Sequence, residues 1–132
     1  MIRGSRMNRE EAEEFVYRSY LRAAKYHSYT EKDAVRRHPE YTKELLERKS
    51  GTPTVVVTGS KGKGSVAKML SEILETRYRV GLMTSPHLLD FCERFQVNGE
   101  KVSSPLFSIL MEEIRPEIEK IEETIPKESC IS

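Results

Sequence analysis

The sequence contains no tryptophan, only two cysteines, and no hydrophobic run long enough to cross a membrane. Cys92 and Cys130 lie far apart, so they predict ordinary cytosolic thiols rather than a disulfide framework or a metal cluster. A transmembrane helix needs about 20 consecutive apolar residues. We therefore predict a soluble, cytoplasmic protein.

An excess of charge of either sign is also lacking. The 22 basic and 21 acidic residues nearly cancel over 132 residues, which leaves a formal net charge of +1. Attraction of nucleic acid or of an anionic membrane needs an excess of positive charge. We therefore expect small-molecule partners, no nucleic acid and no membrane, and any basic site must be local. A chain of this length forms one domain or part of a larger one.

The most informative stretch runs from Thr54 to Leu70. Thr54–Thr58 is rich in β-branched residues, a glycine- and lysine-rich loop follows, and apolar residues then recur at helical spacing. This order predicts a strand, a loop and a helix. Glycines allow such a loop to turn its N–H groups toward one point, and the helix adds unpaired N–H groups and the positive end of its dipole, which suits a phosphate. The predicted cofactor-binding residues are Gly59, Ser60, Lys61, Gly62, Lys63, Gly64 and Ser65.

The loop departs from the usual P-loop spacing, G-x-x-x-x-G-K-[ST]. Only two residues separate Gly59 from Gly62, and Gly64 stands where a magnesium-binding hydroxyl is expected. Ser65 follows one position later and is a candidate to replace that hydroxyl. Lys63 is predicted to reach the β- and γ-phosphates of a nucleotide as a mobile point charge. The alternative is a Gly/Lys-rich surface turn, but the flanking strand and helix patterns favour phosphate binding.

The segments before this stretch are predicted to be helical. Asn8 and Glu11 have the spacing of a capping box, and the apolar residues after them predict an amphipathic helix to about Tyr26. Pro39 predicts the first turn of a second helix, which Gly51 ends.

A second strand is predicted over Tyr78–Thr84, after a helix that ends near Thr76. Strand, crossover helix and strand form a βαβ unit with a parallel sheet. Ligands of open α/β sheets bind at the carboxyl ends of the strands, so the loop Ser85–Arg94 is expected to face the same crevice as the glycine-rich loop. Asn98-Gly99 then predicts a hairpin over Phe95–Val102.

The last predicted element is a helix with Ser103 or Ser104 as its cap and Pro105 in its first turn. Pro116 should kink this helix or split it in two. No further strand is predicted before Ser132.

Three motifs in order resemble those of a known family. They are Gly59–Ser65, Thr84–Leu88 and Glu93–Gly99. They look like G-T-[NK]-G-K-G-S, T-S-P-H-L and E-R-I-x-I-N-G of the folylpolyglutamate synthase and dihydrofolate synthase group within the Mur ligase superfamily. Three motifs at matching separations are far more specific than any one of them. The clear match runs from about Val55 to about Phe107, and the segment before it lacks the family's usual glycine-containing approach to the P-loop.

The resemblance implies a ligase of one-carbon metabolism that depends on ATP and Mg²⁺. In the family, ATP phosphorylates a carboxylate of a folate or pteroate, and the amine of glutamate attacks the acyl phosphate to form an amide. The similarity gives Lys63 a catalytic role on the β- and γ-phosphates and places a magnesium ligand at Ser85, with Ser65 as the weaker candidate. His87 and Arg94 match the family pattern, and each either orders its loop or contacts the acceptor substrate.

The expected fold class is α/β, a P-loop-type parallel sheet with N-terminal helices and a C-terminal helix in an incomplete Mur-ligase-like central domain. Residues 1–7 are interpreted as a disordered or vector-derived start, and residues 8–132 as the N-terminal part of the ATP-binding domain. Within that part, 8–51 are expected to be helical, 54–104 to form the βαβ unit with an Ω-type loop and a hairpin, and 105–124 to form a helix.

Further functional parts of the family cannot be located in the sequence: an acidic magnesium ligand, a histidine, a modified lysine and a second α/β domain. We therefore expect an N-terminal part of a longer ligase, inactive alone, with the missing C-terminal part as its partner. Two alternatives stay open. One is a Mur-type amide ligase for another carboxylate acceptor, and the other is a non-catalytic nucleotide-binding module.

Overall fold

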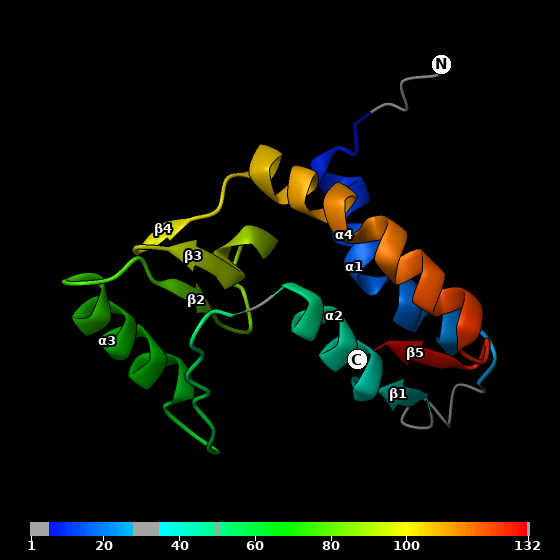
Figure 1. The fold of residues 1–132 in the computed structure, drawn as a ribbon, viewed down its shortest axis with the longest axis horizontal. Coiled ribbons are helices and arrows are strands. Elements are labelled where there is room, and N and C mark those ends of the chain that lie inside the picture. The colour runs from blue at the N-terminus through cyan, green and yellow to red at the C-terminus, as the bar shows by residue number, and fades with distance from the viewer. Residues whose placement is uncertain (1–5, 28–34, 50, 132) are drawn as a thin grey trace. The chain divides into compact units, whose positions relative to one another are not determined.

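The structure is a computed structural model that describes residues 6–27, 35–49 and 51–131. The chain divides into two compact units (Figure 1). The first unit combines the chain up to Thr52 with the residues from Ser108 onward, and the second unit is Pro53–Phe107. Both units combine helices with short strands, and the first contains a parallel pair, so the predicted α/β class is confirmed. Among the described residues, no helix has both the length and the apolar character that a membrane span requires.

Helix α1 (Arg9–Ala24) opens the first unit and begins with the predicted capping box. The Glu11 N–H donates to Asn8 Oδ1 at 2.9 Å, and the Asn8 N–H donates to Glu11 Oε2 at 2.7 Å. These two bonds satisfy donors that a helix start otherwise leaves unpaired. The helix buries Phe15, as its apolar spacing predicted.

A parallel strand pair lies against α1 in the first unit. Strand β1 (Arg36–His38) pairs with β5 (Ser129–Ile131), and the Ile131 N–H donates to Ser19 Oγ on α1 at 3.0 Å (Figure 1). Cys130 is 1% exposed and packs in a core cluster with Ala23. Neither strand is predicted by the sequence, so the expectations of an all-helical segment over 8–51 and of no strand after the hairpin are wrong. Three-residue strands are too short to show a periodic pattern.

Two further helices belong wholly or mostly to the first unit. Helix α2 (Pro39–Lys49) begins at its proline as predicted. Helix α4 (Ser104–Thr124) continues through Pro116 as one element, so of the two predicted outcomes, a kink or a split, the split is wrong. A proline removes one intrahelical hydrogen bond, but a tertiary contact holds the part of α4 beyond it. Arg18 of α1 donates to Glu122 at 2.6 Å, and that carboxylate side chain is only 4% exposed.

The second unit contains one long helix and a small sheet. Helix α3 (Lys63–Glu75) ends next to Thr76, as predicted. Strands β2 (Gly81–Met83), β3 (Phe95–Val97) and β4 (Glu100–Lys101) form an antiparallel sheet in that order (Figure 1). The predicted hairpin is therefore confirmed as β3 and β4.

The predicted parallel βαβ unit is wrong for the described residues. Thr54–Thr58 carries no strand, and Val55 and Val56 are 67% and 77% exposed. The predicted second strand is reduced to β2, which pairs antiparallel with β3. A strand requires a partner for its N–H and C=O groups. The β-branched run has the composition of a strand, but none of the described strands pairs with it.

An aromatic cluster forms the core of the second unit. It contains Phe91, which opens the short 3₁₀ helix η2 (Phe91–Arg94), together with Phe95 and Phe107. The three ring centroids lie 5.6–5.8 Å apart, within the range of favourable aromatic pairs. Phe91 and Phe107 are 4% and 2% exposed. This cluster fixes the segment that follows β2 against the sheet and the first turn of α4.

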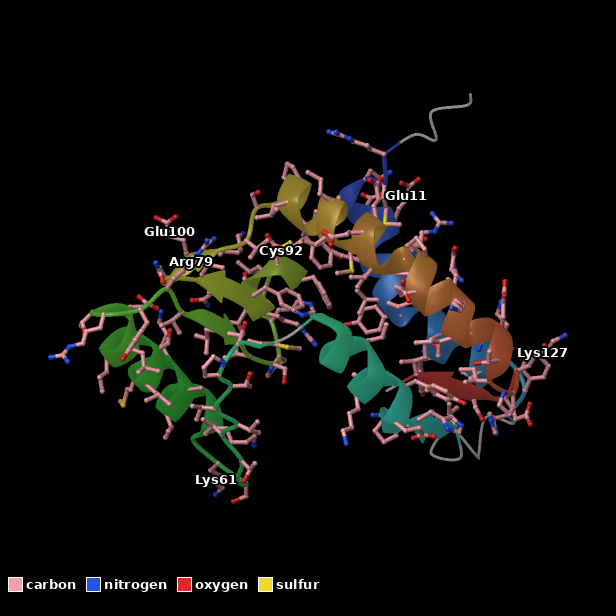
Figure 2. The ribbon with its side chains drawn as sticks, in the orientation of Figure 1. Glu11, Lys61, Arg79, Cys92, Glu100 and Lys127 are labelled. Atoms are coloured by element: carbon pink, nitrogen blue, oxygen red, sulfur yellow. The ribbon has the colours of Figure 1, made fainter. Side chains whose placement is uncertain are left out.

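The hairpin turn needs backbone angles that favour Asn and Gly. Asn98 has φ 48° and Gly99 has φ 74°, as the Asn-Gly pair predicted. The Val80 N–H donates to Asn98 Oδ1 at 2.8 Å, so the turn also holds the start of β2. Figure 2 shows Arg79 and Glu100 at this same end of the sheet.

Replacing Gly99 by alanine is expected to destabilise the chain by about 1–2 kcal/mol, because an L-residue is strained at positive φ. Lack of space is not the cause, since the atom nearest to the place of the alanine methyl group, Glu75 Oε2, is 3.5 Å away. The measurement is urea unfolding followed by circular dichroism. Gly81→Ala on β2 is the control, because its methyl group meets nothing within 4 Å. Equal stability of the two variants would contradict the prediction.

Candidate nucleotide site and the loop after β2

The glycine-rich loop leads directly into α3, and the backbone N–H groups at the start of this helix are left uncapped. Gly62 is the N-cap residue at φ 74°, and no side chain caps the helix. Gly59 also has a positive φ, at 144°. The first N–H groups of α3 therefore lie at an exposed helix start, together with the positive end of the helix dipole. This is the arrangement in which helix N-termini bind phosphate.

Lys63 is the first residue of α3, and its ammonium group lies over the loop. Lys63 Nζ donates to the Gly59 carbonyl oxygen at 2.7 Å. The side chain thus turns back toward the loop instead of away from it, as a phosphate-binding lysine requires. The residue is exposed, so its charge is accessible to a ligand.

The other predicted loop residues are also exposed. Figure 2 shows Lys61 at the tip of the loop, away from the body of its unit. Ser65 stands in the first turn of α3 and is exposed. Within the described ranges, no group of three or more His, Cys, Asp or Glu residues is placed to hold a metal ion.

Hydrogen bonds close the second predicted loop, Ser85–Arg94, at its base and also link residues inside it. The Thr84 N–H donates to the Arg94 carbonyl oxygen at 2.9 Å, which brings the two ends of the segment together, as an Ω-type loop requires. Inside the loop, the Glu93 carboxylate accepts from the N–H groups of Leu88 at 2.9 Å, Leu89 at 3.4 Å and Asp90 at 3.2 Å. The loop is thus organised by its own carboxylate.

His87 and Arg94 contact each other inside this loop. Arg94 Nε donates to His87 Nδ1 at 3.0 Å, and the guanidinium carbon lies 5.0 Å from the Phe91 ring centroid. His87 also meets Phe91 edge-on, with 5.5 Å between ring centroids. Because an arginine N–H only donates, Nδ1 of His87 acts as the acceptor, and its ring proton is on Nε2. Two roles were predicted for His87 and Arg94, ordering their loop or contacting the acceptor substrate. This contact fits the first of these roles.

Ser85 begins the loop and is exposed, and its peptide bond to Pro86 is cis. The contacts given above hold each loop together internally, Lys63 with Gly59 in the first and Glu93 with Leu88 in the second.

Sequence reasoning assigned no role to Glu93 itself. The spacing of Asp90 and Glu93 is that of a capping box, which the structure contains at the start of η2, so this signal could have found it.

The pKa of Glu93 is lowered, chiefly by the Leu88 N–H, and further by the N–H groups of Leu89 and Asp90 and the charge of Lys101. A carboxyl group whose folded pKa is depressed contributes stability above its ordinary pKa, and that contribution is lost as the pH falls through the lowered value. We expect the amide resonances of Leu88 and Leu89 to follow this titration, with a midpoint below the ordinary glutamate pKa. The measurement is a series of ¹H–¹⁵N spectra at decreasing pH. A midpoint at or above the ordinary value would contradict it.

Comparisons with known proteins identify relatives for about half of the chain. No protein-family model matches it. The chain is 39% identical over 69 residues to a dihydrofolate synthase/folylpolyglutamate synthase of Bacillus subtilis, covering 52% of this chain and 16% of that protein. It is 43% identical over 67 residues to a probable bifunctional folylpolyglutamate synthase/dihydropteroate synthase of Haloferax volcanii, covering 50% and 8%. A folylpolyglutamate synthase of Saccharomyces cerevisiae is 48% identical over 58 residues, covering 41% and 11%.

Two solved structures share the fold. The apo form of the L. casei folylpolyglutamate synthase matches with a TM-score of 0.65 and 20% identity, covering 89% of this chain and 27% of that chain. The folylpolyglutamate synthase of Thermotoga maritima matches with a TM-score of 0.58 and 30% identity, covering 89% and 26%. The chain thus spans about a sixth or less of the curated relatives given above and about a quarter of the solved ones. These comparisons confirm the resemblance that the three motifs indicated.

Proposed function

We propose that this chain, which is similar to folylpolyglutamate synthases over about half of its length, is the ATP-binding portion of a ligase of that kind. The reaction would join glutamate to a carboxylate of a folate or pteroate through an acyl phosphate. Lys63 would be the catalytic cation, and the nucleotide would be bound by the loop Gly59–Ser65. Because most of the length of the relatives has no counterpart here, we expect the chain alone not to turn over.

One observation carries this proposal: an uncapped helix start, a left-handed glycine and a lysine ammonium group all belong to one exposed loop. The N–H groups at the start of α3 would donate to phosphate oxygens without moving, and such fixed donors stabilise developing charge effectively. Lys63 would exchange its bond to the Gly59 carbonyl for the β- and γ-phosphates. Its flexible stem allows that movement at little cost.

Ser85 and Ser65 fit a magnesium ion whose ligands come mainly from the phosphates of the substrate and from water. Mg²⁺ keeps several waters and is usually bound through one or two protein oxygens and the phosphates of the substrate. Ser85 offers such an oxygen, and Ser65 is the second candidate. When bound, Mg²⁺ offsets the negative charge of the phosphates.

The experiment is equilibrium dialysis of the chain with ATP, with and without magnesium. We expect saturable ATP binding that magnesium strengthens. No saturable binding under either condition would overturn the proposal.

A second experiment identifies the acceptor by measuring ADP release from the gene product that carries this segment. It would be supplied with glutamate and either dihydropteroate or tetrahydrofolate, beside a panel of other carboxylates. Release that depends on the folate or pteroate is expected. Release that is independent of them would instead support a Mur-type ligase for another acceptor. ATP binding without any acceptor-dependent release would support a non-catalytic nucleotide-binding module.

A further inference from the structure

Glu93 makes an unusual number of contacts to the main chain of its own loop. One carboxylate accepts from three consecutive N–H groups, those of Leu88, Leu89 and Asp90. Hydrogen bonds to an ionised acceptor are roughly twice as strong as neutral ones. The side chains of Leu88 and Leu89 are 89% and 92% exposed, so apolar packing does not hold this part of the loop in place. The carboxylate is therefore the main restraint on its backbone.

The contacts around Glu93 fix where the carboxylate itself lies. The Glu93 N–H donates to the Asp90 carbonyl oxygen at 2.9 Å, and the Cys92 N–H donates to Asp90 Oδ1 at the same distance. Asp90 Oδ2 in turn accepts from Lys101 Nζ on β4 at 2.6 Å. Cys92 is 1% exposed and anchors η2 in the core of the unit. Glu93 thus links the exposed part of the loop to the buried residues of η2 and, through Asp90, to the sheet.

Arg94 restrains the other side of the same loop. Its Nε donates to His87, two residues after Ser85, and its main-chain oxygen accepts from Thr84, directly before Ser85. Neighbouring residues therefore restrain the loop on both sides of its exposed leucines. A loop held in this way is ordered before any ligand arrives, which lowers the entropy cost of binding one.

We propose that Glu93 is a positioning residue for the ligase site: its hydrogen bonds to the N–H groups of Leu88, Leu89 and Asp90 hold the loop that begins at Ser85 in the conformation that binds the ligand. This inference rests on the proposed function, since it takes Ser85 as a magnesium ligand. Glu93 itself would contact neither nucleotide nor metal. It acts only through the backbone that carries Ser85 and His87.

The test is Glu93→Gln, measured by hydrogen exchange and by ATP binding. The neutral amide has one acceptor oxygen in place of two, and its NH₂ group faces backbone donors. We expect amide exchange at Leu88 and Leu89 to accelerate about tenfold or more, with exchange in β3 unchanged. We also expect the strengthening of ATP binding by magnesium to shrink, while ATP binding without magnesium stays the same. A purely structural role would lower both kinds of binding together.

The matched control is Glu100→Gln, which removes the same charge from an exposed position on β4. It should leave loop exchange and the magnesium effect unchanged. If Glu93→Gln does not fold, Glu93→Asp keeps the charge, shortens the side chain, and should show the same changes to a smaller degree. An unchanged magnesium effect in a folded Glu93 variant overturns this inference alone. ATP binding to the unaltered chain that magnesium does not strengthen also overturns this inference, and lack of any saturable ATP binding overturns the proposed function as well.

Discussion

Lys63→Ala is expected to weaken the binding of ATP with magnesium by about 10- to 100-fold, the range for loss of hydrogen bonds to a charged group. The ammonium group already lies within the loop, bonded to the Gly59 carbonyl at 2.7 Å, so its removal deletes the only side-chain charge that the structure shows bonded to this loop in the described part of the chain. The helix N–H groups remain in the variant, and for this reason some binding should persist. Isothermal titration calorimetry measures the change.

Lys127→Ala is the matched control for this substitution. Lys127 is exposed in the other unit, and its replacement removes the same charge and the same methylene groups (Figure 2). Its ATP affinity should equal that of the unaltered chain. If Lys63→Ala binds ATP as tightly as the control, the assignment of the glycine-rich loop as the nucleotide site is wrong.

Phe91→Ala is expected to lower the free energy of unfolding by about 3–5 kcal/mol, as for other buried Phe to Ala changes. Phe91 is 4% exposed and contacts the rings of Phe95 and Phe107, so the smaller side chain leaves a cavity at the centre of the second unit. It also removes the ring beneath Arg94. A loss of this size is a large part of the total stability of a small domain. Urea unfolding followed by circular dichroism measures it.

Leu88→Ala provides the control on the same loop. The Leu88 side chain is 89% exposed, so its truncation should change stability by less than about 0.5 kcal/mol. Similar losses for the two variants would mean that the aromatic cluster does not form the core of the second unit in solution.

The elements that the sequence predicted correctly are those with local signals. The capping box of Asn8 and Glu11 starts α1, Pro39 starts α2, and Asn98-Gly99 forms the hairpin turn. Each signal acts within a few residues, through a cap, a preset φ angle or a positive φ angle. Tertiary context is not needed to recognise them.

The elements that sequence reasoning missed or misplaced depend on distant partners. Strands β1 and β5 pair across more than half of the chain, and a three-residue strand has no periodicity of its own. The run Thr54–Thr58 shows the opposite case, because it has strand composition but no pairing partner among the described strands. Hydrogen bonding between strands is a property of the pair, so a pattern in one segment does not establish it.

For the candidate site too, sequence reasoning found some features and missed others. The glycine-rich loop, Lys63 and the loop that begins at Ser85 were all found from residue type and order. The contacts of Lys63 with Gly59, of Arg94 with His87 and of Glu93 with the main chain were not. The Lys63 contact is made within the glycine-rich loop and the start of α3, and the contacts of Arg94 and Glu93 depend on where η2 and the sheet place these side chains.

The sequence alone determined a glycine- and lysine-rich loop at a helix start, three motifs in order, and the helices and turn around them, because glycine dihedrals, caps and helix dipoles are local properties. The tertiary structure decided which strands pair and that β2 joins an antiparallel sheet. These features require groups from separate segments to meet at hydrogen-bonding distance, and only the folded chain brings them together.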